Sequence, residues 1–159
     1  MTSNSKMQVV GLALSVIMLL TLLNSGYFFL AMLKLSIGKW LAFNACSLAT
    51  IAYLLCFVLY KTTKRDYILA IPLLPLYYYG TMGMFVMPWN EANLFPQITH
   101  IIITLNVLWI VYVLLKEHKF EALGKGSLLG MIIFVPIFAC IQGYTQQHMG
   151  EFMAVLQAL

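Results

Sequence analysis

The chain has 159 residues, of which 62% are hydrophobic and only 9% are charged. Soluble domains carry roughly 25% charged and 45–50% apolar residues. The composition therefore excludes an ordinary soluble domain, and it predicts one integral membrane domain over residues 1–159. The net charge is +4, but the basic residues fall in short loops and form no stripe, which argues against nucleic-acid binding.

Five uncharged apolar stretches follow one another along the chain. Each is close to the roughly 20 residues that an α-helix needs to cross about 30 Å of hydrocarbon. They lack the period-two alternation of membrane-barrel strands, so we expect helices. The predicted fold is therefore all-α, a bundle of five transmembrane helices. The expected spans are residues 9–33, 40–60, 67–87, 97–115 and 127–149, and residues 151–159 are expected to prolong the last helix or to lie at the interface.

The basic residues predict the orientation of this bundle. Lys6 precedes the first stretch, three cations lie between the second and third, and three more lie between the fourth and fifth. Only Lys34 and Lys39 fall on the other side. Because cytoplasmic loops are enriched in Lys and Arg, we expect a cytoplasmic N-terminus and an external C-terminus, in the plasma (cytoplasmic) membrane.

Small residues predict where the helices pack, because they let two helix backbones approach closely. Prolines at positions 72, 75 and 136 each remove a backbone hydrogen bond and predict kinks in the third and fifth helices. The small residues are Gly11, Ser15, Ser25 and Gly26 in the first helix, Ala42, Ala45, Ala49, Ala52 and Cys56 in the second, and Gly126 and Gly130 in the fifth.

Polar residues collect in the outer half of the predicted bundle, whereas the inner half is nearly all Leu, Ile, Val, Met and Phe. Polar side chains in hydrocarbon need partners and usually face the bundle interior. The pattern predicts a polar pocket, open to the outside, that binds or passes a small neutral molecule or a lipid. Interfacial anchoring is the alternative interpretation of the same residues. The expected ligand-binding residues are His100, Thr104, Tyr144, Gln147, Asn24, Asn44, Tyr78 and His148.

Helical geometry ranks these candidates. Residues of an α-helix advance by about 100°, so His100 and Thr104 share a face, while Asn106 lies about 120° away from His100. We therefore expect a cavity between the fourth and fifth helices, with His100 facing Tyr144. Asn106 and Gln142 are expected to form hydrogen bonds with other helices.

Other functions remain open from the sequence. Glu91 and His100 lie on one side of the predicted membrane and are candidate catalytic residues of an intramembrane enzyme. His100 and His148 could hold a metal or a haem, although no metal-binding motif requires one, and the three cysteines are interpreted as packing residues. The small-residue faces could also dock on a larger membrane complex or on a second copy. No predicted span contains Asp, Glu, Lys or Arg, which argues against a proton-driven transporter.

Overall fold

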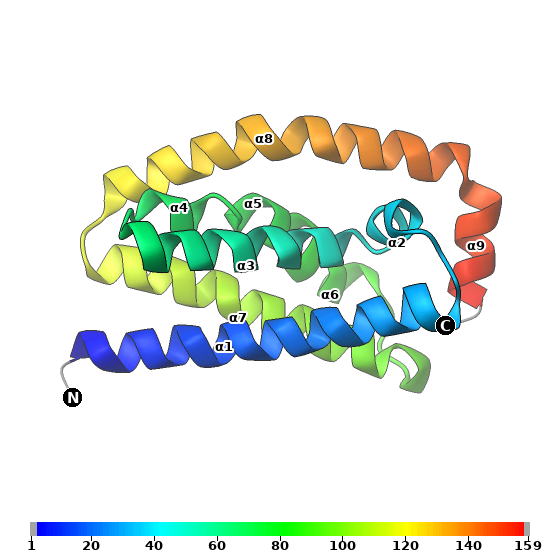
Figure 1. Cartoon of the computed structure of the whole chain (residues 1–159), viewed down its shortest axis with the longest axis horizontal. Coiled ribbons are helices and arrows are strands. Elements are labelled where there is room, and N and C mark those ends of the chain that lie inside the picture. The colour runs from blue at the N-terminus through cyan, green and yellow to red at the C-terminus, as the bar shows by residue number, and fades with distance from the viewer. Residues whose placement is uncertain (1–2, 158–159) are drawn as a thin grey trace.

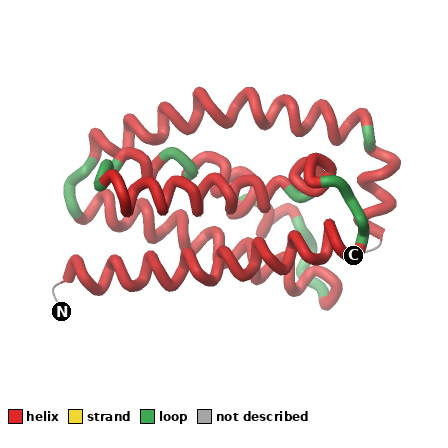
Figure 2. Tube along the Cα trace, in the orientation of Figure 1, coloured by secondary structure: helices red, strands yellow, loops and turns green. Residues whose placement is uncertain are grey.

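The computed structural model describes residues 3–157, and every regular element in that range is a helix (Figures 1 and 2). Five helical segments are long and apolar enough to cross a membrane, which confirms the all-α, five-span architecture and indicates a multi-pass membrane protein. These segments are Lys6–Met32, Ala45–Thr63, Tyr67–Val86, Leu94–Lys116 and Phe120–Gln147.

The spans differ in their internal regularity. The second, fourth and fifth are the single α-helices α3 (Ala45–Thr63), α7 (Leu94–Lys116) and α8 (Phe120–Gln147). The first joins α1 (Ser3–Gly26) to a π-helical segment, η1 (Tyr27–Met32). The third is divided into α4 (Tyr67–Ala70), α5 (Leu73–Pro75), the π-helical η2 (Leu76–Thr81) and α6 (Gly83–Val86). Outside the spans lie α2 (Ile37–Phe43), the 3₁₀-helix η3 (Glu91–Asn93) and α9 (Met149–Gln157).

Two predicted spans need correction. The stretch predicted over residues 40–60 is broken at Asn44, whose φ of −127° and ψ of 67° are not helical. Asn side chains compete with helical hydrogen bonding, and the Asn44 amide instead bonds to Ser25 of α1. The stretch predicted over 127–149 begins earlier, at Phe120, because the helix extends beyond its apolar part to include two charged residues. Of the predicted tail, residues 151–157 belong to α9, which turns away from the axis of α8 (Figure 1), and residues 158–159 lie outside the described range.

The prolines act as the sequence predicts in the third span. The α4 segment ends at Ala70, and Pro72 follows with a ψ of 1°, so the regular helix is interrupted before α5 begins. In contrast, Pro136 lies inside one continuous helix, and α8 follows a gentle arc rather than a sharp bend (Figure 1). The third span is therefore divided into more segments than any other described span.

Small residues mark the close helix contacts, as predicted. A Cβ atom at Gly126 would lie 2.1 Å from the carbonyl oxygen of Tyr67, and one at Gly130 would lie 2.3 Å from that of Ile71, so α8 rests directly on the backbone of the third span. Gly11 of α1 lies against the ring of Trp109 in α7. Ser15 bonds to the buried Tyr53 hydroxyl of α3 at 2.9 Å. These contacts join α8 to the third span, and they join α1 to α7 and to α3.

The two ends of the bundle differ in charge. One end carries the start of α1 and the turns α3–α4 and α7–α8; the other carries α2, α9 and the α6–α7 connection (Figure 1). Seven of the nine basic side chains and three of the five acidic ones belong to the first end, which is net +4, while the second has two of each and is neutral. We call them the basic end and the neutral end.

Candidate functional site

A cavity of about 380 Å³ lies near the neutral end of the bundle. Its walls come from the end of α1 with η1, the corner between α2 and α3, the residue after α6, and the start of α7. One set of lining side chains is polar, and another is aromatic. The polar ones are Thr21, Asn24, Ser25, Asn44, Ser47, Thr50, Thr99 and His100, and the aromatic ones are Phe28, Phe29, Phe43 and Phe95. We call this cavity the polar pocket.

One wall of the polar pocket is held together by the hydroxyl group of Ser25. Its Oγ accepts hydrogen bonds from Trp40 Nε1 at 3.1 Å and from Asn44 Nδ2 at 2.8 Å, and it lies 3.0 Å from Ser47 Oγ. A hydroxyl has two acceptor positions and one hydrogen, so Ser25 donates that hydrogen to Ser47. The Ser25 hydroxyl is then fully used in joining α1, α2 and α3, and a ligand must be bound by other groups.

His100 is the most distinctive polar side chain in the lining. It is only 6% exposed, and its ring packs on Gly83, where a Cβ atom would lie 2.6 Å from Cε1. Its Nδ1 atom is buried and has no hydrogen-bond partner in the described part of the chain. An orphaned N–H is the rarer and costlier case in protein interiors, so we place the proton of the neutral ring on Nε2. His100 is thus a buried group with unused hydrogen-bonding capacity beside a cavity.

The polar pocket includes three of the predicted ligand-binding residues, namely Asn24, Asn44 and His100. It lies between α1, α3 and α7, rather than between α7 and α8 as we expected. Thr104 is turned toward the third span, where its hydroxyl bonds to Thr81 at 3.2 Å. His100 also packs on the third span, at Gly83, and at the same time lines the polar pocket.

The other predicted residues lie outside the lining of the polar pocket, either on α8 and at its end or, for Tyr78, on η2 beside α8. Tyr78 stacks on Phe138 with ring centroids 5.1 Å apart, and it accepts a hydrogen bond from Gln142 at 3.2 Å. The rings of Tyr144 and His148 stack at 4.1 Å, and Gln147 is exposed. The structure therefore does not bring these side chains together with His100.

The two amide side chains expected to bridge helices behave differently. Gln142 bonds to another helix, through Tyr78, as predicted. The prediction for Asn106 is wrong for its donor, because Nδ2 bonds to the Ile102 carbonyl of its own helix at 2.9 Å. The Asn106 Oδ1 atom is buried without a partner in the described residues.

The catalytic and metal candidates are also separated. Glu91 is exposed in η3 and does not line the polar pocket, so the structure does not pair it with His100. His148 lies at the end of α8, with its ring against Tyr144. Among residues 3–157, no three His, Cys, Asp or Glu side chains gather into a metal-binding group.

The four phenylalanines of the lining were not among the predicted ligand-binding residues. In an apolar chain, a phenylalanine that faces a cavity has the same pattern as one that faces lipid, so no signal separates them. Ser47, Thr50 and Thr99 did carry a signal, since they are polar residues within apolar stretches.

No protein-family model, no curated protein and no solved structure matches the chain significantly. The chemistry of the polar pocket therefore follows from its own lining. Hydroxyl, amide and imidazole groups can form hydrogen bonds with a polar group, and the phenyl rings can pack against hydrocarbon. Such a lining fits an amphiphilic molecule, which has both a polar group and a hydrocarbon part.

Proposed function

We propose that the protein binds a small amphiphilic molecule, a lipid or a compound of similar character, in the polar pocket. The observation that carries this proposal is His100, a buried imidazole with an unpaired ring nitrogen in the wall of a 380 Å³ cavity. Buried polar groups in hydrocarbon normally have partners, and ligand pockets typically have volumes of about 300–1,000 Å³. A bound molecule with a hydrogen-bonding group would meet the imidazole together with the hydroxyl and amide groups of the lining.

The lining also limits the charge of the ligand. None of the described lining residues is Asp, Glu, Lys or Arg. A net charge would therefore be buried without a counter-charge, which is costly. We infer an uncharged or zwitterionic ligand, whose apolar part lies against Phe28, Phe29 and Phe95.

We further propose that the neutral end faces the outside and that the membrane is the plasma membrane. The concentration of net charge at the opposite end supports this orientation, because cytoplasmic loops are rich in Lys and Arg. The polar pocket then opens in the outer half of the bilayer. The π-helical segment η1 forms part of its wall, and π-helical turns are frequent at functional sites.

A pocket-filling variant tests the proposal. Thr99→Phe adds a ring inside the polar pocket, whereas Leu105→Phe adds one on the exposed face of the same helix. Small molecules that co-purify with each protein are extracted and identified by mass spectrometry. We expect one amphiphile to be retained by the wild type and by Leu105→Phe, and to be reduced roughly tenfold or more in Thr99→Phe.

Other outcomes of this experiment would favour the alternatives. If nothing co-purifies with the wild type, or if Thr99→Phe retains the same molecule, binding in this pocket is refuted. An accessory subunit that docks on a larger membrane complex, or on a second copy, would then be the leading hypothesis. The acid–base enzyme has less support than either, since Glu91 lies outside the lining that contains His100.

A further inference from the structure

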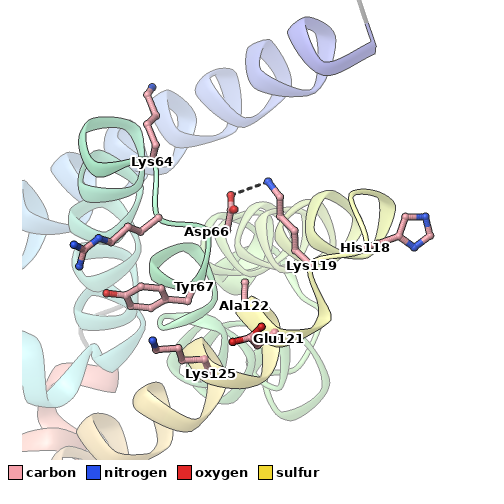
Figure 3. Close-up of a pocket in the computed structure, with 9 residues that line it drawn as sticks. Lys64, Asp66, Tyr67, His118, Lys119, Glu121, Ala122 and Lys125 are labelled. Carbon is pink, nitrogen blue, oxygen red and sulfur yellow. Dashed lines mark hydrogen bonds and ion pairs between the residues drawn. The ribbon is translucent and has the colours of Figure 1, made fainter.

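A second cavity, of about 400 Å³, lies at the basic end and is independent of the polar pocket. It forms where the α3–α4 and α7–α8 turns meet (Figure 3). Lys119 joins these turns, because its Nζ atom donates to Asp66 Oδ1 at 2.9 Å and also pairs with Glu117. We call this cavity the basic pocket. Its charged lining residues are Lys64, Arg65, Asp66, Lys119, Glu121 and Lys125.

The basic pocket has more cations than its carboxylates neutralise. Lys119 is engaged by Asp66 and Glu117, but within the described residues Lys64, Arg65 and Lys125 form no ion pair. Lys125 lies over the ring of Tyr67, with Nζ 4.8 Å from the ring centroid. In Figure 3 the Lys125 side chain and the Tyr67 ring lie together, while Lys64 points away from them.

An apolar stripe continues from the basic pocket along α8. Leu128, Ile132 and Val135 follow Lys125 by three, seven and ten residues, so they lie on the same side of the helix. They are 55%, 63% and 54% exposed, respectively. The helix therefore presents a cation at the point where the span begins and an uncovered hydrocarbon surface beyond it.

We propose that the basic pocket binds the phosphate group of an anionic phospholipid, whose acyl chains lie along this stripe of α8. Arg65 and Lys125 supply the charge, and basic pockets at the ends of membrane helices are suited to acidic headgroups. A free phosphate ion presents the same anion, but it would make no use of the apolar stripe. Glu121 opposes the anion, because it is a carboxylate in the lining with no ion pair to another described residue.

Substitution of the charged lining residues should weaken lipid binding at some positions and strengthen it at another, and this can be tested. Binding of phosphatidylglycerol and of phosphatidylcholine to the purified full chain in detergent is measured by native mass spectrometry. We expect the wild type to prefer phosphatidylglycerol. Arg65→Gln and Lys125→Gln should each weaken its binding roughly fivefold, and Glu121→Gln should strengthen it. Lys6→Gln removes a cation at the same end, outside the basic pocket, and should leave binding unchanged.

Each alternative outcome has a distinct meaning. Equal binding of the two lipids, or equal effects of Lys125→Gln and Lys6→Gln, would overturn the site. If Glu121→Gln increases binding of phosphatidylglycerol, a substitution in the lining has changed the affinity without misfolding the protein. Displacement of phosphatidylglycerol by millimolar inorganic phosphate, together with no effect of Ile132→Ser, would identify a free-phosphate site and overturn the lipid assignment. A loss of binding in Ile132→Ser, with no displacement by phosphate, would support it.

Discussion

At the scale of single residues, the wall of the polar pocket depends on one hydroxyl group. Ser25→Ala would leave the Trp40 and Asn44 donors without their acceptor, and an unpaired donor costs about 1–3 kcal/mol. We expect the free energy of unfolding in detergent to fall by about that amount, as measured by denaturant titration. Thr62→Ala removes an exposed hydroxyl that bonds only to its own helix, so it should change the free energy by about 0.5 kcal/mol or less. Equal effects of the two variants would contradict this role of Ser25.

The sequence predicted how deep in the membrane the polar side chains lie better than it predicted the direction in which they point from their helices. Asn24, Asn44 and His100 were predicted from polarity near one membrane surface, and all three line the polar pocket. Tyr144 lies near the same surface but belongs to a different part of the bundle. A helical wheel gives the angles within one helix, but the rotation of that helix against its neighbours depends on packing. Here the contact of Gly83 with His100 is part of what sets the rotation of α7.

At the scale of elements, two glycines of one helix provide a matched comparison. An Ala side chain at Gly126 would meet Tyr67 O at 2.1 Å, whereas nothing lies within 4 Å of a Cβ atom at Gly124. Gly126→Ala should therefore destabilise the contact of α8 with α4 by about 1–3 kcal/mol. Gly124→Ala should be neutral or stabilise the protein by up to about 1 kcal/mol, through helix propensity. Thermal unfolding in detergent measures both, and similar melting temperatures would show that α8 does not rest on α4 at Gly126.

Features of the helices could be predicted from the sequence where a single residue causes them. The break around Pro72 and the close approach at Gly126 both follow from the chemistry of single residues. The π-helical segments could not be predicted, because each depends on hydrogen bonds such as Leu33 N to Phe28 O at 3.0 Å, which leave no pattern in the sequence. The break at Asn44 also depends on a distant partner, since the Asn44 side chain bonds to Ser25 of another helix.

The contact between α2 and α9 is expected to depend on pH. The hydrogen bond to Glu151 raises the pKa of Lys39 above 10.5, and the same bond lowers the pKa of Glu151 below 4.5. The contribution of Glu151 is present above its unfolded pKa of 4.5 and is lost as the pH falls through the lower folded value. That of Lys39 is present below 10.5 and is lost as the pH rises through the higher folded value.

Spin labels can measure this contact, because Gly38 and Gly150 both face open space. With cysteines at these positions and the native cysteines replaced, the distance distribution should stay narrow between those two pKa values. It should broaden at more acidic pH, as Glu151 takes up a proton. Glu151→Gln should broaden it at every pH. A narrow distribution in that variant would show that the ion pair does not hold α9 in place.

At the scale of the whole molecule, the two proposed sites lie at opposite ends of one bundle, and the charge difference between the ends relates them to the membrane. Net charge is +4 at the basic end and zero at the neutral end. With the basic end in the cytoplasm, the basic pocket meets the leaflet that carries most of the anionic lipid. The polar pocket then faces the outside. The reverse orientation would place seven cations across the membrane, against the usual bias.

Cysteine labelling in intact cells tests this orientation. In a background without the native cysteines, Glu91→Cys lies in the exposed α6–α7 connection and Thr62→Cys lies in the exposed last turn of α3. We expect a membrane-impermeant thiol reagent to label position 91 in intact cells and position 62 only after the membrane is opened. Both positions should react in detergent, which controls for access. Labelling of position 62 in intact cells would reverse the orientation: the polar pocket would then open toward the cytoplasm, and the basic pocket would meet the outer leaflet.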